Sequence, residues 1–89
     1  CDFVLCSHGH EDHCADALAL ARRCGATILA NYELGEFFAA QGARVHTLNP
    51  GGGHDFPFGH LKLTLAVHSS SYETGGARRY MGEPCGLLI

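Results

Sequence analysis

The sequence predicts an α/β or mixed layered fold, and three observations support this prediction. Short apolar, β-prone runs alternate with two helix-like segments along the first half of the chain. The expected element order is β-α-β-α-β-β-β, with no internal repeat. The composition, 46% hydrophobic and 17% charged residues, is that of a globular protein rather than a disordered one.

The first half of the chain is expected to form two strands, each followed by a helix. Residues 3–6 are apolar and β-prone, as in a short buried strand. A helix should start near Asp12, whose charge suits a helix N-terminus, and stop at Gly25. Residues 27–30 predict a second buried strand, and residues 32–41 predict a second helix that stops at Gly42.

The second half is expected to be mostly β-structure. Residues 44–48 predict a short strand or edge segment, followed by a Pro- and Gly-rich turn over residues 49–53. Residues 56–58 lead into an expected hairpin turn at Gly59-His60. Residues 61–67 show strand periodicity and run straight into His68. We expect a loop over residues 69–79 and the start of another strand at residues 87–89.

Both ends of the chain resemble cuts through a longer protein. The chain opens on Cys1 and an apolar run, and it closes on another apolar run, Gly86-Leu87-Leu88-Ile89. Natural termini are usually loosely ordered surface segments. We therefore expect residues 1–89 to form a single partial domain, truncated at both ends. The alternative is a small intact domain whose terminal strands pair.

Charge and cysteine content restrict the function classes. With 6 basic and 9 acidic residues the net charge is −3, which gives no basic footprint for nucleic acid. No apolar run reaches the ~20 residues of a membrane helix. The 5 cysteines are odd in number and include no Cys-x-x-Cys pair, which favours a reducing, cytoplasmic location. We expect a small-molecule substrate and no membrane or nucleic-acid partner, and the oligomeric state stays open.

The chemistry is concentrated in one stretch, Ser7-His8-Gly9-His10-Glu11-Asp12-His13. His8 and His10 are two residues apart, so in an extended segment both imidazoles point to the same side and can meet one metal ion. Asp12 and His13 lie at the turn into the helix and can face a second ion, where the helix N-terminus should keep His13 neutral. Imidazole and carboxylate ligands suit zinc, iron and nickel.

This stretch matches the His-x-His-x-Asp-His signature of metallo-β-lactamase superfamily hydrolases. Other segments are similar to one small family within it, the metal-dependent hydrolases. These segments are Leu5-Cys6-Ser7-His8, Ala30-Asn31-Tyr32-Glu33, Asn49-Pro50-Gly51-Gly52, Val67-His68-Ser69-Ser70-Ser71 and Gly82-Glu83-Pro84.

The resemblance implies a partial metallo-β-lactamase αββα sandwich, in which a mixed β-sheet has helices packed on one face. It implies that His8, His10 and His68 bind one metal ion and that Asp12 and His13 bind a second. Asp12 could also orient the nucleophile as a catalytic residue. Zinc is the first choice for the two divalent ions, and manganese, iron and nickel are alternatives. The bridging aspartate and final histidine of the family have no match in this chain, so the chain alone is not expected to be active.

The implied reaction is hydrolysis, in which two metal ions lower the pKa of bound water so that hydroxide forms near neutral pH. The substrate could be an ester, thioester, lactone, amide or phosphodiester. Two alternatives stay open: a structural-zinc module that also uses Cys6 or Cys14, and a nucleic-acid-processing member of the superfamily. The sequence leaves several roles undecided, namely those of Ser69, Ser70, Ser71, Arg78, Arg79 and Glu83. We expect His46, His54 and His60 to be surface or turn residues.

Overall fold

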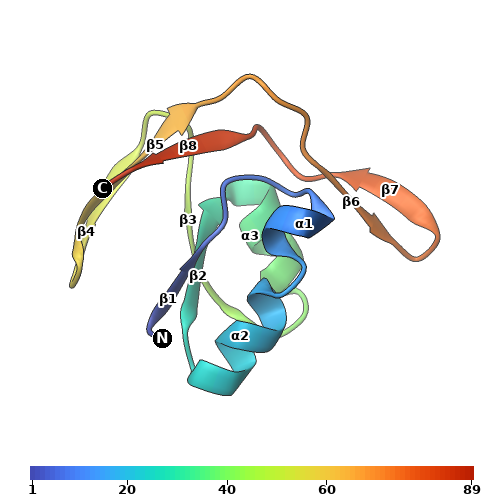
Figure 1. The fold of residues 1–89 in the computed structure, drawn as a ribbon, viewed down its shortest axis with the longest axis horizontal. Helices are drawn as coiled ribbons and strands as arrows, with labels where there is room; N and C mark the ends of the chain where they lie inside the picture. Colours follow the sequence, from blue (N-terminus) through green and yellow to red (C-terminus); the bar gives the residue numbers. More distant parts are fainter.

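The computed structural model describes all residues from 1 to 89 and contains parallel and antiparallel strand pairs with helices (Figure 1). The elements in chain order are β1 (Phe3–Leu5), α1 (Glu11–Cys14), α2 (Ala17–Cys24), β2 (Thr27–Asn31), α3 (Tyr32–Ala39), β3 (Arg44–Leu48), β4 (Gly53–Phe56), β5 (Gly59–Leu65), β6 (Ser71–Thr74), β7 (Ala77–Tyr80) and β8 (Cys85–Leu88). None of the helices has the length and apolarity that crossing a bilayer requires.

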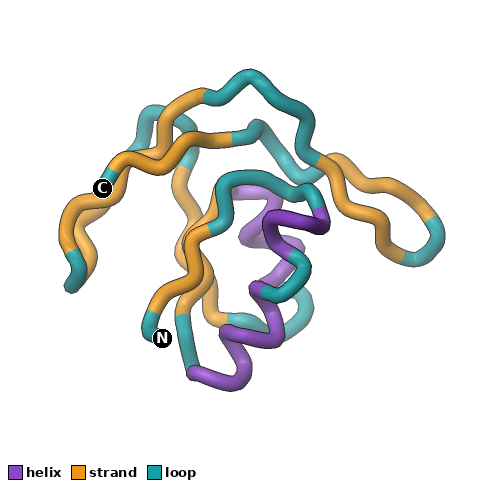
Figure 2. The backbone as a smooth tube through the Cα atoms, in the orientation of Figure 1, coloured by secondary structure: helices purple, strands orange, loops and turns teal.

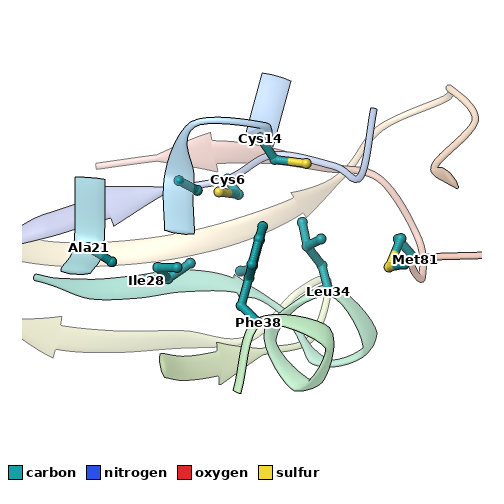
Figure 3. Close-up of a cluster of buried hydrophobic side chains, with 9 residues drawn as sticks. Cys6, Cys14, Ala21, Ile28, Leu34, Phe38 and Met81 are labelled. Atoms are coloured by element: carbon teal, nitrogen blue, oxygen red, sulfur yellow. The ribbon is translucent and has the colours of Figure 1, made fainter. Parts of the chain in front are cut away.

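The first half forms a parallel sheet in the order β1-β2-β3. Helix α2 packs against β1 and β2, and α3 packs against β2 and β3. Because successive crossovers between parallel strands are right-handed and run in the same direction here, both helices cover one face of the sheet. The alternating residues Ile28 and Ala30 of β2 enter the core beneath them. Figure 3 shows Leu34 and Phe38 extending from α3 into this core, towards Cys6 and Cys14.

The helix expected from Asp12 to Gly25 is two helices, so this part of the prediction was wrong. Helix α1 ends after one turn at Cys14, and α2 begins at Ala17. No proline or glycine marks the break, which is why the apolar pattern predicted one continuous helix. The predicted stop is confirmed, because Gly25 adopts the left-handed conformation with φ 66° and donates its N–H to Ala21.

The second sheet is antiparallel, in the order β4-β5-β8. The hairpin turn falls at residues 57–58, not at Gly59-His60 as predicted, and β5 starts at Gly59. Leu61 and Leu63 are fully buried. The strand ends at Leu65, two residues earlier than predicted. The Ala66 N–H still donates to the Pro84 carbonyl, but Pro84 has no N–H to return a bond to Ala66, so the ladder stops there.

Residues 69–79 do not form the loop that the sequence predicted, because most of them belong to the β6–β7 hairpin. Its turn is Gly75-Gly76, with φ of +60° and +80°. A two-residue hairpin turn of this kind matches the twist of the strands only if both residues accept positive φ, which glycine does without strain. The hairpin extends away from the two sheets (Figure 1). Strands β1 and β8, near the two ends of the chain, lie in different sheets and do not pair.

Candidate metal centre

Two loops carry the histidines that the sequence singled out. One connects β1 to α1, and the other, over residues 66–70, connects β5 to β6 (Figure 2). They bring together His8, His10 and His68, whose ligand atoms all lie within 4.8 Å of one another. The ring of His68 is 4.9 Å from that of His8 and 4.9 Å from that of His10. The fold therefore brings His8 and His10, which are two residues apart, together with His68, which is nearly sixty residues further along the chain.

His8 is the innermost member of this group, with 7% of its surface exposed. Its Nδ1 is 2.9 Å from the Ser7 hydroxyl, whereas its Nε2 is buried and has no hydrogen-bond partner. Burial lowers the pKa of His8, and the neighbouring His13, His10 and His68 lower it further, so the neutral ring is favoured. Buried polar atoms without a partner are rare in folded proteins. A neutral imidazole nitrogen among two other imidazoles fits a metal ion as the missing partner.

Asp12 and His13 lie on α1, beside the three histidines. The ring of His13 is 4.2 Å from the ring of His8, and its Nε2 is 3.6 Å from the Asp12 carboxylate. Both side chains are open to solvent, with exposed fractions of 83% for Asp12 and 49% for His13. Neither is among the three histidines whose ligand atoms all lie within 4.8 Å of one another. The assignment of Asp12 and His13 to a second metal ion therefore stays a prediction.

The serines and arginines near the histidines have partners within the protein. The Ser69 hydroxyl, whose role the sequence left undecided, lies 3.0 Å from Nε2 of His10. Arg78 pairs with Glu11 at 3.2 Å. The Glu73 backbone N–H donates to the Glu11 carboxylate at 2.8 Å and, ahead of Arg78, holds the pKa of Glu11 below its ordinary value. Arg79 lies over the ring of Phe37, with its guanidinium carbon 5.8 Å from the centroid.

The cysteines of the structural-zinc alternative are core residues. Cys6 and Cys14 are both buried, and burial raises the pKa of Cys6 to about 11 and that of Cys14 to about 12. The Cys14 thiol donates to the backbone carbonyl of His10 at 3.3 Å. A metal ligand must be a thiolate, which these surroundings disfavour. The group of potential ligands consists of histidines alone.

The other three histidines lie apart from this group, on β3, β4 and β5. The rings of His46 and His54 are 4.5 Å apart, and His54 is exposed. His60 is exposed and bonds through Nδ1 to Asp55 at 2.6 Å. The prediction of surface positions is confirmed for His54 and His60, whereas His46 is half-buried on β3, where its ring lies 5.0 Å from that of Phe56.

Sequence reasoning missed the role of Asn31, which is 2% exposed at the junction of β2 and α3. Its Oδ1 accepts the Leu34 N–H and caps α3, while its Nδ2 donates to the carbonyls of Met81 and Glu83. An asparagine between a strand and a helix is a typical N-cap, so the capping role was visible in the sequence. Glu83, for which the sequence suggested no role, also accepts the Tyr80 hydroxyl at 2.8 Å.

Comparison with known proteins yields relatives along the whole chain. A family model described as "Beta-lactamase superfamily domain" matches residues 1–89. A UPF0173 metal-dependent hydrolase of Opitutus terrae is 51% identical over 90 residues, covering 100% of this chain and 40% of the relative. Another, from Exiguobacterium sp., is 46% identical over 88 residues, covering 99% of this chain and 39% of the relative. The chain therefore spans about two-fifths of the length of the curated relatives it matches.

A solved structure agrees with these sequence relatives. Igni18, a metallo hydrolase from the hyperthermophilic archaeon Ignicoccus hospitalis, matches with a TM-score of 0.82 and 31% identity. The match covers 98% of this chain and 36% of Igni18. The predicted fold class, part of a metallo-β-lactamase fold, is thereby confirmed, as is the resemblance to the metal-dependent hydrolases. The chain belongs to the β-lactamase superfamily, and the curated relatives that it matches are named metal-dependent hydrolases.

Proposed function

We propose that this chain carries the first part of the active site of a metal-dependent hydrolase that acts on a small molecule. The observation that carries the proposal is Nε2 of His8, a buried imidazole nitrogen without a partner that lies among two other imidazoles. The hydrolase names of the relatives support the same activity. We also propose that residues 1–89 are part of one larger domain, since the relatives are more than twice as long.

In this proposal His8, His10 and His68 bind one divalent ion, and Asp12 and His13 bind a second. Zinc is the first candidate, because three imidazoles with an open position are typical of catalytic zinc sites. When bound, such ions lower the pKa of coordinated water from ~15.7 to about 7 and polarise the substrate's electrophilic group.

The chain's own residues would prepare this chemistry. Ser7 holds the His8 ring through Nδ1 and leaves Nε2 free to bind. The lowered pKa of His8 keeps its ring neutral and able to bind a metal ion at neutral pH. In this proposal Asp12, which is exposed beside His13, orients the nucleophile. The free state of all five cysteines supports a reducing compartment such as the cytoplasm.

The test is elemental analysis of the full-length protein that contains this chain. We expect about two metal ions per chain, as in binuclear hydrolases, and a lower content in His8→Ala and in His68→Ala. His54→Ala is the matched control, because His54 is an exposed histidine outside the cluster, and its metal content should equal that of the wild type.

Three results would argue against parts of the proposal. Unchanged metal content in His68→Ala would remove His68 from the site. A single tightly held zinc would favour the structural-zinc alternative. A folded protein that binds no metal would mean that the chain shares the ancestry of the metal-dependent hydrolases but lacks their metal chemistry. If metal is bound, esters, thioesters, lactones, amides and phosphodiesters should be screened as substrates, because the fold does not choose among them.

A further inference from the structure

We propose that Ser70 is a positioning residue of the metal centre, and this inference rests on the metal-dependent function proposed above. Its hydroxyl joins the two loops that carry the histidines and thereby sets the position of His68 relative to His8 and His10. The three consecutive serines after His68 thus have different roles. Ser69 contacts a histidine ring, Ser71 contacts Arg78 on the hairpin, and Ser70 joins the two loops.

The central contact is a buried hydrogen bond between the two loops. The Gly9 backbone N–H donates to Oγ of Ser70 at 3.0 Å, and Ser70 is 4% exposed. Gly9 is the residue between His8 and His10, and Ser70 follows His68 by two positions. The bond therefore connects the midpoint of the first ligand pair to the segment that carries the third ligand.

A third segment closes this junction, which we define as Gly9, Ser70 and Met81. The Met81 N–H donates to the Ser70 carbonyl at 3.1 Å, and the buried Met81 side chain covers Gly9. A methyl group on Gly9 would lie only 2.7 Å from Cγ of Met81 and 3.3 Å from Oγ of Ser70. The side chains of Met81 and Ser70 can pack this closely against Gly9 because Gly9 has no side chain of its own.

The connection between β7 and β8 is also attached to both histidine loops. The Cys85 N–H donates to the Ser7 carbonyl at 2.8 Å, and the Ala66 N–H donates to the Pro84 carbonyl at 3.2 Å. The Ala66 bond attaches the second loop at the end of β5, and the Cys85 bond attaches the first loop beside His8, whereas the Gly9–Ser70 bond joins the two loops to each other. Loss of the Ser70 hydroxyl would leave the buried Gly9 N–H without an acceptor and free the loops to separate where the ligands lie.

The neighbouring serines provide the comparison. Ser69 contacts the His10 ring directly, and Ser71 accepts from the Arg78 guanidinium at 3.2 Å on the hairpin. Ser71→Ala is therefore a matched control: it removes the same group one residue away, outside the junction. Ser70→Thr keeps the hydroxyl and tests whether the oxygen, rather than the volume of the side chain, is needed.

The experiment uses the full-length protein and three measurements on each variant: zinc affinity by chelator competition, the visible absorption spectrum with cobalt(II) at full occupancy, and hydrogen exchange of the Gly9 amide in the metal-free protein. For Ser70→Ala we expect zinc affinity to fall by about 10–100-fold, the cobalt bands to shift, and Gly9 exchange to accelerate. Ser71→Ala should match the wild type in all three, and Ser70→Thr should lie closer to the wild type than Ser70→Ala.

Several results would overturn the inference. Faster Gly9 exchange with unchanged zinc affinity and spectrum would mean that the bond is structural only. Equal losses in Ser70→Ala and Ser71→Ala would indicate a general effect on the loop. A wild-type protein that binds no metal would overturn the proposed function itself. If the wild type binds metal and Ser70→Ala has the same zinc affinity and cobalt spectrum, only the positioning role of Ser70 is overturned.

Discussion

Replacement of Asn31 should separate two contributions that one buried side chain makes to stability. Its Oδ1 caps α3, and its Nδ2 donates to Met81 at 3.0 Å and to Glu83 at 2.7 Å. The orientation of the amide follows from these partners, because only the oxygen can accept the Leu34 N–H and only the nitrogen can donate to the carbonyls.

Two terms set the size of the effect. Loss of an N-cap costs about 1 kcal/mol. A buried carbonyl left without its donor costs about 1–3 kcal/mol, and we count only Met81, because the Cys85 thiol also donates to Glu83. Asn31→Ala should therefore lose about 2–4 kcal/mol of unfolding free energy. Serine caps nearly as well as asparagine but is too short to reach Met81, so Asn31→Ser should lose about 1–3 kcal/mol.

The assay is urea denaturation of the full-length protein, with Gln41→Ala as the control. Gln41 is exposed at the opposite end of α3, where its side chain bonds only to the Phe37 carbonyl, and its removal should cost less than about 0.5 kcal/mol. Wild-type stability in Asn31→Ser would refute the contribution of the bond to the Met81 carbonyl. Equal stability of Asn31→Ser and Asn31→Ala would refute the contribution of the cap.

Three further predictions concern the thiols, the hairpin and one tyrosine. Alkylation of the folded protein should modify the exposed Cys1 and Cys24 quickly and the three buried cysteines slowly, since burial disfavours their thiolates, and a uniform rate for all five would contradict the burial. Arg78→Ala removes the contact to Glu11 and should accelerate amide exchange in residues 71–80 while the denaturation midpoint stays nearly constant; unchanged exchange would show that the ion pair does not hold the hairpin. The hydrogen bond to Glu83 raises the pKa of Tyr80, so this contact stabilises the fold below the ordinary tyrosine pKa and is lost as pH rises through the raised value. Ultraviolet titration should show one tyrosine ionising at lower pH in Glu83→Gln than in the wild type, and superimposable curves would contradict it.

The parallel half of the fold was predictable because its signals are local. Apolar runs followed by polar residues marked β1 and β2, and Gly25 marked a helix end whose backbone requires positive φ. The break between α1 and α2 carries no breaker residue. The β6–β7 hairpin was missed because β7 is exposed, β6 is no more than half-buried, and both are rich in polar residues, so they lack the alternation that a buried face imposes. Its Gly75-Gly76 turn was the one local signal for it.

The candidate site divides along similar lines. The side-by-side position of His8 and His10 follows from their spacing in an extended segment. The contact of His68 with them depends on sheet packing across nearly sixty residues, which only the family resemblance could anticipate. The bond of Ser70 to Gly9 and the bonds of Asn31 to Met81 and Glu83 lie beyond both kinds of reasoning, because each joins segments whose proximity results from the complete fold.

The attachment of the β6–β7 hairpin has a mechanical consequence. Its first strand starts at Ser71, three residues after His68, and its side is held by Glu11, the residue between His10 and Asp12. Both tethers thus end within the histidine-bearing segments. The chain itself connects the Gly75-Gly76 turn to the segment that carries His68, and side-chain contacts connect it to Glu11 beside His10. We therefore expect that a longer turn, or a partner bound to it, would change the spacing of the imidazoles, although no residue of the turn lies among them.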